Sequence, residues 1–275
     1  QASRPDRLQR EGPFLLDFLG RRPAEGPVLD VGCGTGEHSR FFVGHGYPSL
    51  GLDRSRDAFV EDLLPSAPSP SGWIRGDLRE IPLESRCARA AVCLGNTLVI
   101  LEEDDAILAA LREIHRVLRD GGGLCLQVLN YHRLRSRNIR SLPLNFHRPA
   151  GDSGAEAAET AYLRLMDFDD PVHVDFLMLR LRLSWQKGEA FVEGSSLRRL
   201  RSIEHDELER LIDLLRPRTV VPVHGRRRNL DALADLARSK GCEVVVVENG
   251  ATMAAFPDAV KRLADRVAAR LAGRV

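Results

Sequence analysis

The sequence predicts an α/β fold: a parallel sheet covered by helices, an antiparallel insertion and a C-terminal βαβ extension. Three observations support it. Short apolar runs alternate with helix-compatible segments over about the first 130 residues. Apolar and polar side chains then alternate with a period of two across residues 162–201, which is typical of antiparallel strands. Near the C-terminus a strand, a helix and a second strand follow one another, an order that implies a right-handed parallel crossover.

The first predicted strand, Val28–Val31, passes directly into three glycines at alternate positions. Gly32, Gly34 and Gly36 strip this turn of side chains, so a ligand can lie against its backbone. A dinucleotide-binding fingerprint needs its third glycine where this chain has Glu37, and a carboxylate there repels a pyrophosphate at a helix N-terminus. No Gly-Lys-Ser/Thr follows, which excludes a Walker-type phosphate loop as well.

The pattern Asp30-x-Gly-x-Gly-x-Gly resembles the first motif of class I S-adenosylmethionine (SAM) methyltransferases, whose fold is a Rossmann-like α/β sheet. Their cofactor carries a sulfonium cation and an amino acid tail, and it has no phosphate for Glu37 to repel. The resemblance implies that Asp30, Gly32, Gly34 and Gly36 contribute to a SAM site.

Two further segments fall at the intervals that this family shows. Ser49–Asp53 is a second short apolar strand that ends in an acid, and the carboxylate of Asp53 can accept both ribose hydroxyls. Residues 73–78 resemble the segment that holds the third strand of the family. This resemblance implies that Asp77 and the backbone N–H of Leu78 meet the adenine edge.

The fourth and fifth predicted strands complete the sheet. Residues 90–97 resemble the fourth strand, and the resemblance implies that Asn96 lies where its carboxyl end opens on the transferred methyl group. The apolar spacing predicts a helix that Asp104 can cap and that stops at residues 120–123. Residues 124–129 are the fifth predicted strand.

Three segments within residues 25–205 look like stations in glycine and sarcosine N-methyltransferases. They are Gly95-Asn96-Thr97, Leu129-Asn130-Tyr131 and Arg164–Phe168. This narrower resemblance implies a small amine or amino acid as the methyl acceptor, and an antiparallel unit over its pocket. His132 departs from the family, which has Asp at this position.

Four polar residues are the candidate catalytic residues on this reading. Asn96, Asn130 and Tyr131 would surround the methyl group, and Arg133 would anchor a carboxylate on the acceptor. Three of them have a structural alternative: a strand-turn cap for Asn96, a core aromatic for Tyr131, and a solvated loop charge for Arg133. An amine acceptor that arrives unprotonated needs no general base, whereas a hydroxyl acceptor needs a general base nearby.

Composition is consistent with a cytoplasmic enzyme. The 275 residues carry a net charge of +1, so charge gives no overall drive towards nucleic acid or a membrane surface. The five cysteines are odd in number and form no Cys-x-x-Cys, so we expect reduced thiols in a reducing compartment. We see no apolar run that could span a bilayer, no secretory leader and no metal-ligand cluster. The oligomeric state and the acceptor's identity stay open.

The C-terminal quarter departs from a typical methyltransferase. Residues 207–256 resemble the C-terminal part of metallo-β-lactamase-fold ribonucleases such as ribonuclease J, and this resemblance implies that His224 contacts a phosphate. The metal-binding cluster His-x-His-x-Asp-His of that family appears nowhere in the chain, so we expect no RNA cleavage. We expect a structural role, with RNA contact through Arg226, Arg227 and Arg228 as the alternative.

The predicted organisation has three parts. Residues 1–147 form a SAM-binding core, residues 148–204 an antiparallel meander on the substrate side, and residues 205–275 a helix and strand extension. The predicted function is SAM-dependent transfer of a methyl group to an N or O atom of a small molecule. One alternative is an RNA-binding or RNA-modifying methyltransferase that uses the basic C-terminal segment. Another is a non-catalytic SAM-binding or assembly protein.

Overall fold

The computed structural model describes residues 4–55, 72–147, 159–184, 189–203, 209, 212, 219–220 and 227–244. Contacts within the chain divide it into two compact units, residues 1–203 and residues 204–275. Both predicted sheets lie in the first unit and the predicted C-terminal extension lies in the second. None of the helices in the described ranges is long and apolar enough to cross a membrane.

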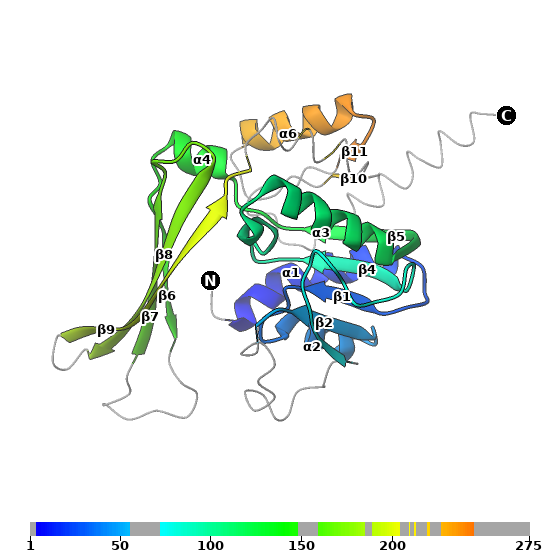
Figure 1. Cartoon of the computed structure of the whole chain (residues 1–275), viewed down its shortest axis with the longest axis horizontal. Helices are drawn as coiled ribbons and strands as arrows, with labels where there is room; N and C mark the ends of the chain where they lie inside the picture. Colours follow the sequence, from blue (N-terminus) through cyan, green and yellow to red (C-terminus); the bar gives the residue numbers. More distant parts are fainter. Residues whose placement is uncertain are drawn as a thin grey trace. The chain divides into compact units, whose positions relative to one another are not determined.

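The first unit is built on a five-stranded parallel sheet in the order β3-β2-β1-β4-β5 (Figure 1). The strand order reverses between β1 and β4, and ligands of open α/β sheets bind outside the carboxyl ends of the strands at such a point. Every residue of β1 and β4 is buried, as expected for strands that are covered on both faces. The strands are β1 (Val28–Val31), β2 (Ser49–Asp53), β3 (Gly72–Arg75), β4 (Ala88–Cys93) and β5 (Leu118–Leu126).

Three helices accompany this sheet: α1 (Arg4–Gly20), α2 (Glu37–Gly44) and α3 (Asp104–Val117). A short 3₁₀ turn, η3 (Leu98–Leu101), precedes α3. Helices α1 and α2 join the core because their apolar faces pack on the middle strands. The contact cluster combines two helices with two strands, through Leu15, Leu19, Phe42, Val28, Ala90 and Val92.

Helix α3 begins at Asp104 with Glu103 as its N-cap, one residue before the predicted cap, and its predicted end is three residues too late. The helix stops at Val117 because Leu118 has an extended backbone and pairs with Ala88 of β4. The glycines at residues 121–123 therefore lie inside β5, beside a register irregularity, and they do not terminate the helix. The prediction that these glycines stop the helix is wrong, because they belong to an irregular edge strand.

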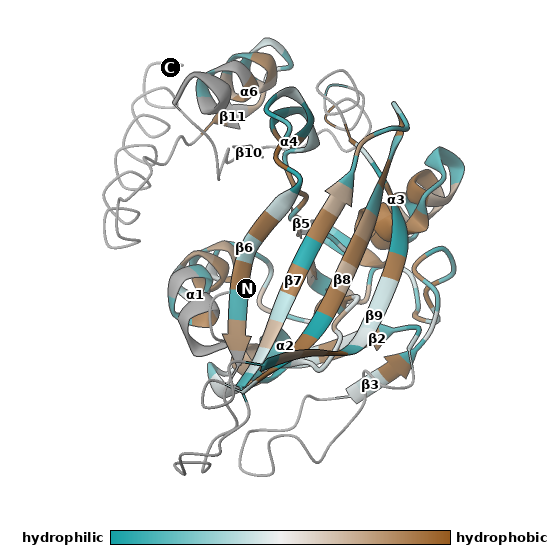
Figure 2. Ribbon diagram, turned by 90° about the vertical axis from the view of Figure 1, so that its left-hand side faces the viewer, coloured by the Kyte–Doolittle hydropathy of each residue, from teal (hydrophilic) through white to brown (hydrophobic). Residues whose placement is uncertain are grey.

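The predicted antiparallel meander is confirmed, with four strands instead of about three. Its order is β6 (Ser141–His147), β7 (Glu159–Asp167), β8 (His173–Ser184) and β9 (Glu189–Arg201). The additional strand β6 is at the sheet edge and contains Pro143, and a proline is tolerated at an edge because it lacks the N–H of an inner ladder. In Figure 2 this sheet is seen broadside, with the parallel sheet behind it.

The second unit contains the predicted parallel crossover. Strands β10 (Thr219–Val220) and β11 (Glu243–Val244) pair in parallel, with α6 (Arg227–Ser239) between them in the chain. The helix packs through an apolar cluster that includes Ile212, Ala237 and Cys242. The predicted phosphate-contacting His224, with Arg226, lies outside the described residues.

Candidate active site

The turn between β1 and α2 has the backbone that its sequence requires. Gly32, Gly34 and Gly36 have φ angles of 69°, 53° and 74°, a left-handed region that side chains disfavour. A Cβ at Gly32 would lie 2.2 Å from the Thr97 side chain, and one at Gly36 would lie 1.8 Å from the Trp73 ring. A Cβ at Gly34 would meet no atom within 4 Å. Gly32 and Gly36 therefore allow the Thr97 and Trp73 side chains to pack against the turn, whereas the backbone of Gly34 borders open space.

Asp53, at the end of β2, is held beside this bare backbone. Its Oδ2 accepts a hydrogen bond of 2.9 Å from the N–H of Gly34, and its Oδ1 accepts one of 2.8 Å from the N–H of Ser55. A carboxylate has about four acceptor sites, so two hydrogen bonds leave acceptor capacity on both oxygens. The arrangement can therefore accept hydroxyl groups from a ligand that lies on the glycine turn.

Asp30 performs a different task at the end of β1. It is 2% exposed, and its Oδ2 accepts hydrogen bonds from the backbone N–H (3.1 Å) and the Oγ (2.7 Å) of Ser39. Burial raises the pKa of this carboxyl, while nearby His38 and the Ser39 hydrogen bonds oppose the rise. Because its bonds go to α2, Asp30 fixes the glycine turn between strand and helix.

Strand β3 ends at Arg75, within the predicted third-strand segment of residues 73–78, and Asp77 and Leu78 follow it. The guanidinium of Arg79 donates to both Asp77 oxygens, at 2.9 Å from Nε and 2.7 Å from a terminal nitrogen. This hydrogen bonding lowers the pKa of Asp77 to about 2. Leu78 is almost fully buried. The carboxylate is thus ionised at neutral pH and already carries a cationic partner.

Asn96 and Tyr131 are brought together where β4 and β5 end. The Asn96 Nδ2 donates a hydrogen bond of 2.6 Å to the Tyr131 hydroxyl, and its Oδ1 accepts one of 3.0 Å from the N–H of Leu129. Asn96 reaches both partners from a left-handed backbone, with φ of 69°. Tyr131 is fully buried, and burial raises its pKa to about 12. The phenol is therefore neutral near pH 7.

The other two candidate residues are joined by a helix cap. Asn130 is the N-cap of α4 (Tyr131–Ser136), and its Oδ1 accepts a hydrogen bond of 2.8 Å from the N–H of Arg133. The Nε of Arg133 is buried and has no hydrogen-bond partner among the described residues. Asn130 therefore shapes the first turn of α4, and Arg133 retains an unused donor.

Sequence reasoning missed residues that support this edge of the sheet. Trp73 lies against Gly36, and it pairs in register with Gly51, where a Cβ would lie 2.5 Å from the same ring. Gln127 accepts a hydrogen bond of 2.9 Å from the N–H of Gly95. A glycine opposite a tryptophan on adjacent strands is the signal that could have identified the first contact.

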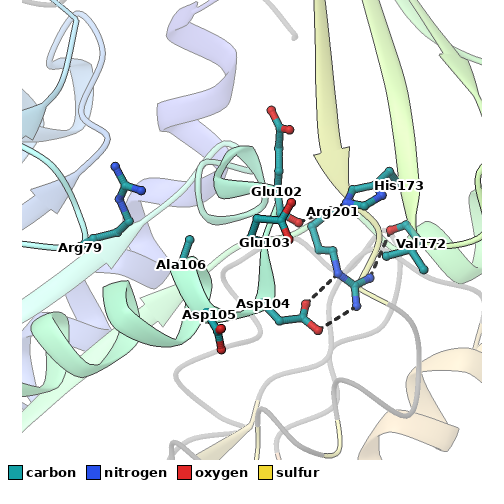
Figure 3. Close-up of a pocket in the computed structure, with 9 residues that line it drawn as sticks. All are labelled: Arg79, Glu102, Glu103, Asp104, Asp105, Ala106, Val172, His173 and Arg201. Carbon is teal, nitrogen blue, oxygen red and sulfur yellow. Dashed lines mark hydrogen bonds and ion pairs between the residues drawn. The ribbon is translucent and has the colours of Figure 1, made fainter.

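A separate cavity of about 600 Å³ lies beside the first turn of α3 (Figure 3). None of its lining residues is a predicted site residue. They are Arg79, Glu102, Glu103, Asp104, Asp105, Ala106, Val172, His173 and Arg201. Arg201, 7% exposed, donates a hydrogen bond of 2.7 Å to Asp104 and another to the carbonyl of Val172. This network joins β9 to α3.

Two family models match the chain. One, described as a methyltransferase domain, covers residues 28–122, and the other, described as a Zn-dependent metallo-hydrolase RNA specificity domain, covers residues 204–247. The first coincides with the sheet that carries the glycine turn, Asp53 and Asn96. The second coincides with the segment that resembles the ribonucleases.

The curated relatives match between about two fifths and two thirds of the chain. The malonyl-[acyl-carrier protein] O-methyltransferase of Serratia marcescens is 32% identical over 123 residues, 44% of this chain and 46% of that protein. The glycine/sarcosine N-methyltransferase of Parasynechococcus marenigrum is 29% identical over 193 residues, 67% of this chain and 62% of that protein. The chain spans about half the length of the O-methyltransferases that it matches.

Solved structures extend the likeness to three quarters of the chain. A SAM-dependent methyltransferase from Clostridium acetobutylicum superposes with a TM-score of 0.57 at 14% identity, over 75% of this chain and 78% of that one. Streptomyces venezuelae DesVI gives 0.56 at 18% identity, over 75% and 84%. SAM-bound CalS10, an amino pentose methyltransferase of Micromonospora echinaspora, gives 0.53 at 19%, over 75% and 82%. The Rossmann-like class I methyltransferase fold is therefore confirmed.

Proposed function

We propose that the chain is a SAM-dependent methyltransferase that transfers a methyl group to a nitrogen or oxygen atom of a small molecule. The observation that carries the proposal is the pairing of Gly34 with Asp53: bare backbone with no atom within 4 Å of a Cβ, and a carboxylate hydrogen-bonded to it. The match of residues 28–122 to a methyltransferase domain supports it. So does the class I fold of the first unit.

The residues present fit SAM as the cofactor. The turn at Gly32, Gly34 and Gly36 would hold the methionine end against its backbone, and Asp53 would accept the ribose hydroxyls. Leu78, with Asp77, would meet the adenine edge. Asp30 acts one step away, because it holds the turn in place through Ser39. When bound, SAM supplies an electrophilic methyl group on a sulfonium.

The chain's own task in this reaction is to orient the acceptor and exclude water, because an in-line displacement from a sulfonium has an intrinsically good leaving group. Orientation of this kind contributes on the order of 7–11 kcal/mol in favourable systems. The Asn96–Tyr131 hydrogen bond fixes two polar groups at the carboxyl edge of β4 and β5. With its pKa raised to about 12, Tyr131 acts there as a hydrogen-bonding phenol.

One acceptor that fits the proposal is a small amine that carries a carboxylate, with Arg133 as the anchor for that carboxylate. The buried Nε of Arg133, which lacks a partner among the described residues, supports this role. Relatives named for glycine and sarcosine agree with an amine, whereas relatives named for malonyl-[acyl-carrier protein] agree with an oxygen acceptor. We therefore keep both atoms in the proposal.

RNA is the second candidate substrate, and one observation favours it: residues 204–247 match an RNA specificity domain. On this alternative the second unit would hold RNA, and binding would weaken steeply with salt because phosphate contacts release counterions. A third candidate, a non-catalytic SAM-binding or assembly protein, would bind SAM with no turnover.

Incubation of the full chain with methyl-labelled SAM separates these candidates. One arm receives a pool of small metabolites, a second receives total RNA, and a third receives neither. The proposal expects label in the metabolite arm. Label in RNA alone supports the second candidate, and no label in either arm, with SAM bound, supports the third.

A further inference from the structure

The segment after β3 carries the two groups that we assign to the adenine edge, the carboxylate of Asp77 and the backbone N–H of Leu78. Leu78 is 8% exposed, and its N–H donates to no group among the residues that the structure describes. Backbone N–H groups of buried residues are almost always paired. This donor is therefore available to a ligand acceptor, and its use depends on how the protein holds the segment.

Asp77 and Leu78 lie in a closed turn that ends at Glu80. The N–H of Glu80 donates a hydrogen bond of 3.1 Å to the carbonyl of Asp77, and these two residues form an antiparallel bridge. The entry to the turn is tied to β2, because the N–H of Gly76 donates to the carbonyl of Asp53 at 3.1 Å. A Cβ at Gly76 would lie 3.0 Å from the Pro82 ring. The residues before and after the turn therefore pack together, and the position of the exit affects the whole turn.

Two side chains of α3 hold the exit of this turn. Oε2 of Glu113 accepts a hydrogen bond of 2.9 Å from the N–H of Ile81. One terminal nitrogen of Arg116 donates to the carbonyl of Ile81 and the other donates to the carbonyl of Leu83, both at 2.8 Å. Ile81 is 2% exposed. Both backbone groups of Ile81 are thus bonded to α3, three residues after Leu78.

Glu113 and Arg116 also fix each other. The Nε and a terminal nitrogen of Arg116 donate to the two oxygens of Glu113, both at 2.7 Å. A bidentate pair of this kind defines an orientation that a lysine cannot reproduce. Hydrogen bonding to Arg116 lowers the pKa of Glu113, so this carboxylate is ionised at neutral pH. The pair therefore presents one acceptor and two donors to the exit of the turn in a fixed arrangement.

We propose that Glu113 and Arg116 are positioning residues for the cofactor: through Ile81 they hold the turn where it can recognise adenine. This inference rests on the proposed function, because it needs SAM on the glycine turn. Adenine presents an amino donor beside a ring-nitrogen acceptor, which matches the carboxylate of Asp77 beside the N–H of Leu78. Hypoxanthine has a carbonyl in place of the amino group and a ring N–H beside it, so it matches neither.

Isothermal titration of the full chain with S-adenosyl-L-homocysteine and with S-inosyl-L-homocysteine tests this inference. The two ligands share their homocysteine and ribose, so the ratio of their Kd values reports recognition of the base alone. We expect wild type to prefer the adenosyl ligand about 10- to 100-fold, as for other paired hydrogen bonds to a base edge. Glu113→Gln and Arg116→Gln should each reduce this preference about 5-fold or more, because the exit of the turn loses hydrogen bonds to a charged group. Arg116→Lys should reduce it as well, since lysine keeps the charge without the fork.

Glu84→Gln is the matched control, because it makes the same substitution at an exposed residue of the same loop, and it should keep the wild-type preference. Circular dichroism checks the folding of each variant, and Arg116→Lys, the mildest change, keeps the test valid if a glutamine variant does not fold. Folded variants that bind both ligands more weakly with an unchanged preference would overturn the inference, because the pair would then have a structural role only. A wild-type chain that binds neither ligand would contradict the proposed function itself, and the inference with it.

Discussion

The backbone N–H of Gly34 donates a hydrogen bond of 2.9 Å to Oδ2 of Asp53, and this bond joins the ends of β1 and β2. It places a carboxylate beside the one glycine of the turn whose missing Cβ faces open space. Most of the proposed cofactor site depends on this pair.

Asp53→Asn should weaken SAM binding about 10- to 100-fold, because an amide replaces the charged acceptor of the ribose hydroxyls and hydrogen bonds to charged groups contribute about 1.5–3 kcal/mol. Isothermal titration measures the effect. Asp120→Asn is the control, since the Asp120 side chain is 87% exposed and lies at the β5 edge. Equal affinity of the Asp53 variant and wild type would place the ribose elsewhere.

Tyr131→Phe should lower the free energy of unfolding by about 1–2 kcal/mol, because the Asn96 amide loses a buried acceptor. The pH profile of turnover should keep its shape between about pH 6 and 9, since the raised pKa of Tyr131, about 12, leaves the phenol neutral there. A basic limb present in wild type and missing in the variant would identify Tyr131 as a general base and contradict this account.

Asp104→Asn should destabilise the first unit by about 1–2 kcal/mol although the Asp104 side chain is 73% exposed. Its partner Arg201 is buried, and the substitution removes the negative charge that pairs with this guanidinium. The neighbouring exposed carboxylate offers a matched control, because Asp105→Asn should change stability by less than about 0.5 kcal/mol. Chemical denaturation of both variants provides the comparison. Similar unfolding free energies for the two variants would contradict the proposal that Asp104 and Arg201 link α3 to β9.

Asp77 should contribute to the loss of folding stability at acid pH. Hydrogen bonding to Arg79 lowers its pKa to about 2, whereas an unfolded Asp titrates near 3.9. The folded state therefore favours the ionised form, and this contribution is present above about pH 4 and is lost as the pH falls towards 2. Asp77→Asn should flatten the fall of the unfolding temperature over that range. An unchanged slope would show that the pair does not form in solution.

The parallel sheet could be predicted because its strands are short apolar runs, each followed by a residue type with a physical role. The residues of two site contacts could also be predicted from the sequence. One contact joins the glycine turn to Asp53, and the other joins Asn96 to Tyr131. All of these residues lie at the ends of predicted strands. The structure then brings the members of each pair within hydrogen-bond distance.

Other features depend on long-range packing that spacing does not reveal. The burial of Asp30 and its bonds to Ser39 follow from how α2 docks on β1. The position of Trp73 over Gly36 depends on the register between β2 and β3. The end of α3 at Val117 depends on the pairing of the next residue with β4. Tertiary pairing outweighed local propensity in each case.

The most direct measurement of the central claim is isothermal titration of SAM into Gly34→Arg. The matched control is Gly46→Arg, because Gly46 also has a positive φ, 82°, and also has no atom within 4 Å of a Cβ, but it lies in the loop before β2, remote from the glycine turn. Both substitutions place the same new cation at a glycine with a positive φ. The account predicts that Gly34→Arg abolishes SAM binding while Gly46→Arg binds like wild type. Unchanged affinity in a folded Gly34→Arg protein would contradict it.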